Sequence, residues 1–267
     1  MHVVPALAAL LFAGISAVPA AASPTYYLFD GDASRGYELT TTGTVVRSFT
    51  TSSLAYPAAV RDSIWLGHRD DAGAREYTLA GVATGATSAG GRGFSQLLDG
   101  ATGSNGLNYG VECCGTVNSV TVANADWSGQ RTLFNLVGNA AGAGIAFDGS
   151  DNTLFVSSFD RRITHYGLDG AVLGAFDLGQ FLVGLAYDES TSSFWGFNRS
   201  TRNLVQFNRA GTVLADVDFG SFAPSNPFGG EMAVLGVAPA AVPEPGMLAL
   251  TAAALMGLVL TRRRARG

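Results

Sequence analysis

The segment GIAFDGSDNTLFVSSFDRRITHYGLDGAVLGAFDLG, residues 144–179, is repeated with substitutions as GLAYDESTSSFWGFNRSTRNLVQFNRAGTVLADVDFG, residues 184–220. Each copy opens with an apolar run that ends in an aspartate, and a turn leads into a second apolar run. A polar loop follows, and then a hairpin that pivots on Gly170 or Gly211. Apolar and polar residues alternate along these runs, which is typical of β-strands, so each copy predicts a unit of four strands.

Weaker hairpins of the same form lie upstream, centred on Gly43, Gly81 and Gly129. The five hairpin glycines are separated by 38, 48, 41 and 41 residues. A four-stranded unit that recurs every ~40–45 residues indicates a blade of a β-propeller. We therefore predict an all-β chain whose residues 23–241, 219 in number, form a five-bladed propeller. A six-bladed ring and an open sandwich are the alternatives that the repeat leaves open.

The two ends of this body predict how the ring closes. The segment TYYLFDGDASRGYEL, residues 25–39, has the pattern of a second strand with no first strand before it. The segment GGEMAVLGVAP, residues 229–239, has the pattern of an innermost strand with no hairpin after it. We expect the late strand to complete the first blade, because this pairing removes two open sheet edges.

Composition favours the same fold class and excludes one class of partner. Only 14% of the 267 residues are charged and 35 are glycine, which suits short strands joined by tight turns. Outside residues 242–267 there are 12 arginines and 20 acidic residues, a net charge of about −8. A body this acidic is not expected to bind nucleic acid.

The N-terminus predicts export. An apolar run extends from Val3 to Val18, and Ala20-Ala21-Ala22 supplies an Ala-x-Ala cleavage site. We interpret residues 1–22 as a secretory signal peptide that is cleaved before Ser23. A buried N-terminal helix is the alternative.

The C-terminus, residues 242–267, has three parts. Val242-Pro243-Glu244-Pro245 comes first, then an apolar run of 15 residues from Met247 to Thr261, and then an arginine cluster. The cluster consists of Arg262, Arg263, Arg264 and Arg266. The run is shorter than the ~20 residues that usually span a bilayer, but flanking arginines that reach the interface permit a short transmembrane helix. The positive-inside rule keeps the arginines in the cytoplasm and the body outside.

This order of parts resembles the PEP-CTERM sorting signal of exopolysaccharide-producing Gram-negative bacteria. The resemblance implies that an exosortase, a membrane-embedded processing enzyme, recognises the Pro-Glu-Pro segment and cleaves near it. The prolines keep this segment extended, in a form that an enzyme can bind. The membrane contact would then be transient, and the body would reach the outer envelope or an exopolysaccharide matrix. A permanent single-span anchor is the alternative.

The best-preserved unit also resembles an NHL-type propeller repeat. The resemblance rests on Gly144-Ile145-Ala146-Phe147-Asp148, on Asp160-Arg161-Arg162-Ile163 and on the turn at Asp169-Gly170. It covers two blades well and the others weakly. NHL-type propellers include binding scaffolds and enzymes, so the resemblance implies a fold and leaves the function open.

The only two cysteines are adjacent, Cys113 and Cys114. An oxidising compartment offers them no other partner in the chain. Neighbouring Cα atoms lie ~3.8 Å apart, below the usual ~4.4–6.8 Å of a disulfide, so a bond between them would be strained. The sequence leaves open whether they form a vicinal disulfide or remain thiols.

Other candidate residues can be interpreted either as functional or as structural. Aspartate-rich turns offer oxygen ligands for calcium, but turns also favour aspartate. These turns contain Asp30, Asp32, Asp148, Asp151, Asp188 and Glu189. Three tryptophans fit either a platform for sugar rings or the core, and the core is favoured. They are Trp65, Trp127 and Trp195. His68, expected in a loop, and His165, expected on a strand, are too few for a histidine-rich metal site.

We therefore expect a non-catalytic binding or scaffold protein with no cofactor, no metal and no catalytic residue. The alternative is a metal-dependent hydrolase similar to the gluconolactonase-like propellers, which hold a divalent ion in the central channel. Of the five glutamates in the body, only Glu231 lies near a predicted innermost strand. Carboxylates and amides from several innermost strands would favour the hydrolase, and small or apolar residues would favour the scaffold.

Overall fold

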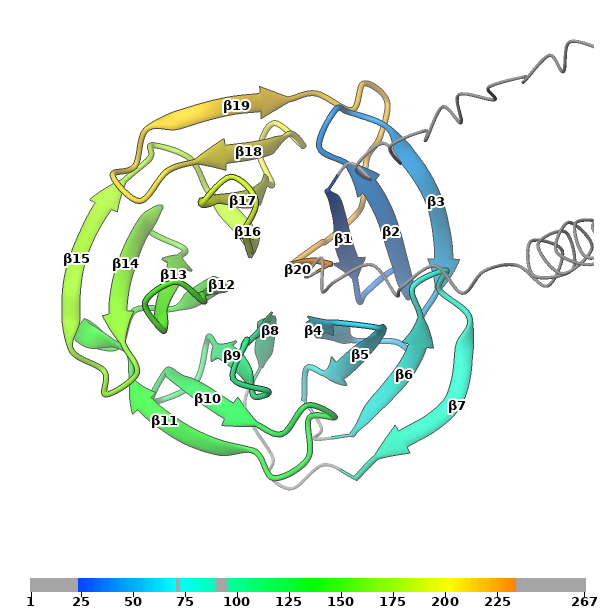
Figure 1. Ribbon diagram of the computed structural model, residues 1–267, viewed down its shortest axis with the longest axis horizontal. Helices are drawn as coiled ribbons and strands as arrows, with labels where there is room; N and C mark the ends of the chain where they lie inside the picture. Colours follow the sequence, from blue (N-terminus) through cyan, green and yellow to red (C-terminus); the bar gives the residue numbers. More distant parts are fainter. Residues whose placement is uncertain (1–23, 71–72, 90–95, 234–267) are drawn as a thin grey trace, which may run out of the picture.

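The computed structural model describes residues 24–70, 73–89 and 96–233. They form five antiparallel sheets of four strands each, arranged around a common centre (Figure 1). The chain is a five-bladed β-propeller. The prediction of an all-β, five-bladed ring is therefore confirmed, and the six-bladed ring and open sandwich are wrong.

Blades A to E are named in chain order, and their strands are given from the centre outward. Blade A contains β20 (Gly229–Met232), β1 (Thr25–Asp30), β2 (Arg35–Thr40) and β3 (Val45–Thr50). Blade B contains β4 (Ala55–Val60), β5 (Ser63–His68), β6 (Ala74–Thr78) and β7 (Ala83–Ser88). Blade C contains β8 (Leu97–Thr102), β9 (Asn108–Glu112), β10 (Ser119–Ala123) and β11 (Arg131–Asn135).

The two remaining blades are the repeated segments. Blade D contains β12 (Gly142–Asp148), β13 (Thr153–Ser158), β14 (Arg162–Gly167) and β15 (Val172–Asp177). Blade E contains β16 (Leu182–Asp188), β17 (Ser193–Asn198), β18 (Leu204–Phe207) and β19 (Val213–Val217). A short 3₁₀ helix, η1 (Val137–Asn139), joins blades C and D.

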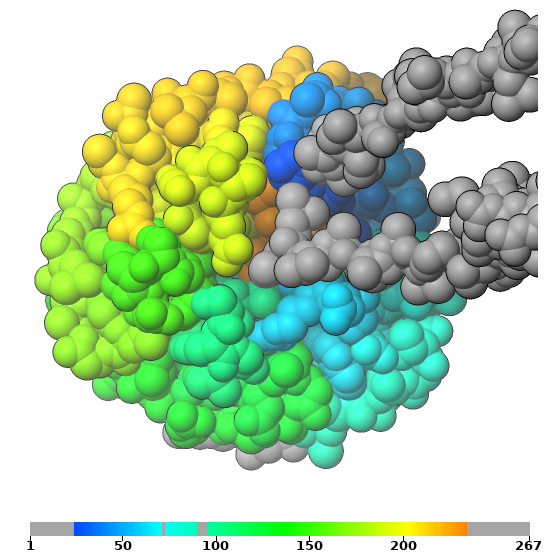
Figure 2. All heavy atoms as spheres, viewed as in Figure 1, coloured from blue at the N-terminus to red at the C-terminus, as the bar shows by residue number. Residues whose placement is uncertain are grey.

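The ring closes as the sequence predicts. Strand β20 pairs with β1, with Tyr26 opposite Met232 and Phe29 opposite Gly229. Blade A therefore combines the first described strand with the last, and Figure 2 shows the blue atoms of this blade beside the orange atoms of β20. Because β20 and β1 come from opposite ends of the described chain, their pairing closes the ring and removes two free sheet edges.

The five hairpin glycines all join the third and fourth strands of a blade. They are Gly43, Gly81, Gly129, Gly170 and Gly211, and their φ angles lie between 63° and 94°. Only glycine adopts this left-handed region at little cost. A Cβ atom at Gly211 would meet the ring of Phe176, and one at Gly170 the ring of Phe134. Each of these hairpins thus packs against the outer strand of the preceding blade.

The core lies between neighbouring blades, where apolar side chains of one sheet pack on those of the next. Phe155 of blade D, for example, contacts Phe194 of blade E with ring centroids 4.2 Å apart. Among the described residues no helix is long and apolar enough to cross a membrane. The span predicted at residues 247–261 lies outside the described part of the chain.

Candidate functional site

The centre of the ring is built around one buried carboxylate, that of Asp99 in β8, which has 0% exposed surface. One oxygen accepts the backbone N–H groups of Ile145 and Leu185, at 2.8 and 2.9 Å. The other accepts the N–H of Gly230 at 2.9 Å. These donors belong to β12, β16 and β20, so a single side chain of blade C is bonded to the innermost strands of blades D, E and A.

Small residues let the innermost strands approach this carboxylate. A Cβ atom on Gly184 would lie 2.9 Å from the Cα atom of Gly230, and one on Gly100 would lie 2.7 Å from the carbonyl oxygen of Ala58. Both distances are shorter than real Cβ contacts, so glycine is required at these two points of β16 and β8. At these two points neighbouring innermost strands meet backbone to backbone.

Glu231 in β20 is the second buried carboxylate of the centre, with 4% exposed surface. Its carboxylate accepts the N–H of Thr102, the last residue of β8, at 2.5 Å. The Thr102 hydroxyl in turn accepts the N–H of Val60 in β4 at 2.8 Å. Glu231 and Thr102 therefore connect blades A, C and B, and with Asp99 they join all five blades.

Burial determines the proton affinity of these groups. It raises the pKa of Glu231 to about 8, although the N–H of Thr102 acts in the opposite direction. It also raises the pKa of Asp99 well above its ordinary value, against the N–H groups of Gly230 and Ile145. Tyr26, whose hydroxyl donates to the carbonyl oxygen of Gly184, has its pKa raised first by burial and then by the charge of Asp99.

The donor set of the ring centre, defined as Tyr26, Asp99 and Glu231, does not fit a divalent ion. Both oxygens of Asp99 and both of Glu231 already accept backbone N–H groups. Within the described residues, no three side chains of the types His, Cys, Asp or Glu are placed to hold a metal ion. The carboxylates therefore act as internal bonds of the ring.

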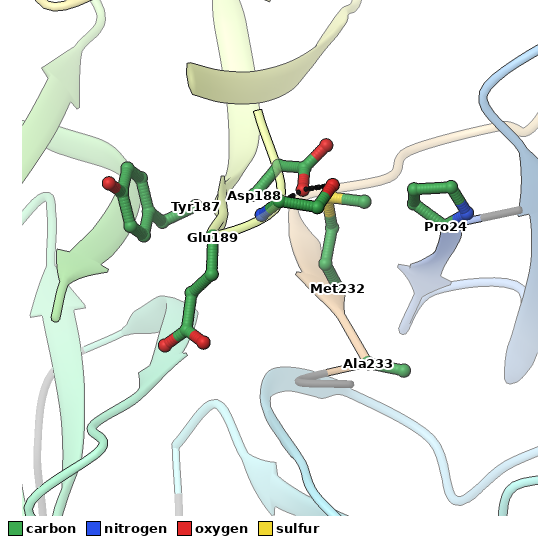
Figure 3. A pocket seen from close by; sticks show the side chains of 7 residues that line it. Pro24, Tyr187, Asp188, Glu189, Met232 and Ala233 are labelled. Atoms are coloured by element: carbon green, nitrogen blue, oxygen red, sulfur yellow. Dashed lines mark hydrogen bonds between the residues drawn. The ribbon is translucent and has the colours of Figure 1, made fainter. Parts of the chain in front are cut away.

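A cavity of about 260 Å³ opens beside the C-terminal ends of β16 and β20, near the first and last described residues. Its lining residues are Pro24, Tyr187, Asp188, Glu189, Ser190, Met232 and Ala233. The Asp188 carboxylate accepts the N–H and the hydroxyl of Ser190, and Figure 3 shows the carboxylate of Glu189 directed away from it. The polar groups of this cavity lie at the end of β16 and in the turn after it, and they do not converge on a common point.

The aspartates that the sequence suggests as calcium ligands accept hydrogen bonds from residues of turns and loops instead. Asp148 and Asp188 each accept the N–H and hydroxyl of the serine two residues later. Asp148 also pairs with Arg209, which lies 2.6 Å from Asp151 as well. Asp30 accepts three donors from Ser225 and Asn226. Arg209 holds Asp148 and Asp151 near each other, but among the described residues no three such side chains form a metal site.

Two of the three tryptophans, Trp127 and Trp195, are core residues. Trp127 has 0% exposed surface, and its indole N–H donates to the backbone of Trp65 in blade B. Trp65 and Trp195 lie on the second strands of blades B and E. Trp195 is 4% exposed. Trp65 is partly buried and packs against the cluster that contains Trp127.

The two histidines in the described residues lie on the second strand of blade B and the third strand of blade D. His165 lies on β14 as expected, stacked on Phe155, and burial lowers its pKa. His68 is the last residue of β5, so its predicted place in a loop is wrong. The strand extends to His68 because its N–H bonds to the carbonyl of Gly73 across the β5–β6 turn.

The two cysteines are joined to each other in the structure. Cys113 is buried and Cys114 is exposed in the loop between β9 and β10. Cys114 has a φ of 67°, so the disulfide coincides with a left-handed backbone position. The sorting residues Val242 to Pro245 and the basic residues Arg262 to Arg266 lie outside the described residues.

Comparison with known proteins shows the fold alone. No protein-family model matches the chain, and no curated protein matches its sequence. A solved chain of the nidogen/laminin complex is similar at 9% identity and a TM-score of 0.56, over 79% of this chain and 99% of that one. Virginiamycin B lyase from Staphylococcus aureus shows 12% identity and a TM-score of 0.48, over 76% and 69%. A Bacteroides caccae protein of unknown function shows 15% identity and a TM-score of 0.48, over 73% of each chain.

Sequence reasoning did not find Asp99. The Asp-Gly pair at residues 99 and 100 is typical of a turn, whereas both residues lie within β8. Its partners follow 46, 86 and 131 residues later in the chain. No local pattern points to such contacts.

Proposed function

We propose that this chain is a non-catalytic binding or scaffold module. The proposal rests on the ring centre. There the side chains of Asp99 and Glu231 accept hydrogen bonds from backbone N–H groups of other blades. Propeller hydrolases need carboxylates or amides that are free to hold an ion or a substrate. Here the same groups hold the ring together, and glycines let the innermost strands lie close to one another around them.

We further propose that the module is exported and works outside the inner membrane. The support is in the two ends of the sequence, the signal peptide at residues 1–22 and the PEP-CTERM-like segment at residues 242–267. An exosortase-type enzyme would cleave near Pro243-Glu244-Pro245 while the short apolar helix holds the chain in the membrane. The body would then remain in the outer envelope or an exopolysaccharide matrix.

Intact-mass measurement of the protein from the host's medium and envelope tests this route. The proposal predicts a chain that begins near Ser23 and ends near Pro243. A wild-type envelope fraction in which the mature chain retains Arg262 to Arg266 would contradict processing. A chain that retains residues 1–22 would contradict export by a cleaved signal.

The rival proposal is a lactonase-like or esterase-like hydrolase that uses a divalent ion. This proposal predicts that the purified protein contains one bound ion per chain and that it releases acid from lactone or ester substrates. The donor set of the ring centre gives it no support in the described residues.

A further inference from the structure

The face of the ring opposite the 260 Å³ cavity carries a second group of side chains. They lie where the innermost strands begin, and we name them the mouth cluster. Its members are Asp32, Tyr56, Phe159, Phe181, Arg199, Asn226 and Phe228. They come from blades A, B, D and E, and Phe181 and Phe228 directly precede β16 and β20. Residues of four blades thus meet where the central strands start, with Asp32 and Phe159 exposed and Tyr56 fully buried.

The apolar part of the mouth cluster is a row of phenylalanine rings. The ring of Phe159 lies 5.1 Å from that of Phe181 and 5.9 Å from that of Phe228, between centroids. Phe159 is 40% exposed, although it follows directly after the buried strand β13. An aromatic ring that is open on one side and supported by two others presents a rigid apolar surface.

The polar part is a continuous hydrogen-bonded row beside these rings. The guanidinium of Arg199 lies 4.2 Å from the centroid of Phe228 and donates to the side-chain oxygen of Asn226. The amide nitrogen of Asn226 donates to Asp32 at 2.7 Å. The hydroxyl of Tyr56 donates to the other oxygen of Asp32, also at 2.7 Å. These bonds hold the row in place before a ligand arrives.

Two members of the row, Arg199 and Asp32, keep unused hydrogen-bonding capacity. Arg199 forms no ion pair within 4.0 Å among the described residues, and burial lowers the pKa of its guanidinium. Only one of its five N–H donors is used for Asn226. Asp32 is exposed, and its hydrogen bond from Tyr56 lowers its pKa, so it is an ionised acceptor. A donor and an acceptor therefore flank the same amide.

The charges near the row disfavour an anionic ligand. Two arginines, Arg69 and Arg199, face three aspartates, Asp30, Asp32 and Asp70, whose combined charge with the arginines is −1. Asp70 is paired with Arg69 at 2.8 Å. A ligand whose groups both donate and accept hydrogen bonds, and which has an apolar face, fits this arrangement. Hydroxyl groups on a saturated ring have both properties.

We propose that the mouth cluster is a binding site for a neutral saccharide. The apolar face of a sugar ring stacks on Phe159, and adjacent hydroxyls bond to Arg199 and Asp32. This inference rests on the proposed binding function and deepens it by naming the site and the class of ligand.

The test is titration of the full chain with four probes, namely cellotetraose, a galactose tetramer, mannotetraose and a galacturonate tetramer. Binding is measured by calorimetry, and the release of reducing ends is measured in the same samples. The variants are Phe159→Ala and Arg199→Gln. Matched controls are Leu173→Ala, an exposed apolar residue of β15, and Arg75→Gln, an exposed arginine of β6. Circular dichroism checks the fold of every variant.

We expect at least one neutral probe to bind, and each mouth variant to weaken it at least about tenfold, while the controls leave it unchanged. The proposal is overturned if no neutral probe binds, if the galacturonate tetramer binds more tightly than every neutral probe, or if folded mouth variants bind as the wild type does. In the last case the binding function stands and the site is wrong. If the probe binds at the mouth and is cleaved, the site stands and the non-catalytic function is wrong.

Discussion

Asp99 accepts a hydrogen bond from the backbone of Gly230, which lies 131 residues later in the chain, at 2.9 Å. This contact joins blade C to the strand that closes the ring. Two further N–H groups, from Ile145 and Leu185, bond to the same carboxylate. The centre of this propeller is therefore a junction of backbone around one side chain, and its loss should affect the entire ring.

Asp99→Ala should lower the free energy of unfolding by at least about 3 kcal/mol, because three buried N–H groups lose their acceptor at ~1–3 kcal/mol each. Urea unfolding measures the loss. The matched control is Asp177→Ala, whose exposed carboxylate accepts one N–H from Gly179, and it should change the stability by less than about 1 kcal/mol. Equal effects of the two variants would show that Asp99 is not a junction.

Glu231 should make the protein less stable as pH rises from 4.5 to 8. Its pKa is raised from 4.5 to about 8 on folding, so between these values the folded state holds a proton that the unfolded state has released. Stability then falls with pH, by at most about 1.4 kcal/mol per pH unit from this group. Below pH 4.5 and above pH 8 this contribution is constant.

Urea unfolding at several pH values from 5 to 8.5 tests this dependence. Glu231→Gln should reduce the slope, and the remainder comes from Asp99, whose pKa is also raised by burial. Glu189→Gln, a change at an exposed glutamate, should leave the slope as it is. A wild-type protein whose stability rises through this window would contradict the assignment.

Gly211→Ala should destabilise the fold by about 1–2 kcal/mol or more, since a φ of 78° is unfavourable for alanine. The new methyl group would also lie 2.6 Å from the ring of Phe176. Gly174→Ala is the control, because no atom lies within 4 Å of its Cβ position and its φ is not positive. Thermal unfolding of both variants gives the comparison, and equal midpoints would argue against the packing of hairpins on preceding blades.

The disulfide between Cys113 and Cys114 should contribute little to stability. It closes a loop with no intervening residue, so it removes almost no entropy from the unfolded chain. Reduction should add the mass of two hydrogen atoms and shift the unfolding midpoint only slightly. Two thiols that react with iodoacetamide in the unreduced, denatured protein would contradict the bond.

The sequence predicts the fold well because blade structure is encoded locally. Glycine at each hairpin and alternation along each strand repeat with the blade, so the five hairpins at Gly43, Gly81, Gly129, Gly170 and Gly211 were all predictable. The closing pair, β20 with β1, followed from the incomplete patterns at the two ends.

The ring centre and the mouth cluster could not be predicted in this way. Arg199, Asn226 and Asp32 are separated by up to 194 residues, and each lies in a loop of ordinary composition. Their meeting depends on how four blades are placed around the axis. Sequence patterns describe one blade at a time, so contacts between blades emerge only from the assembled ring.

The central claim is that the carboxylates of the ring centre hold strands together and do not bind an ion. Metal content by mass spectrometry, combined with thermal unfolding of the full chain before and after addition of Ca²⁺ or Zn²⁺, tests it most directly. We predict less than one equivalent of any divalent ion and an unchanged unfolding midpoint. One tightly bound ion per chain, with a stabilisation that Glu231→Gln abolishes, would contradict the claim and favour the hydrolase.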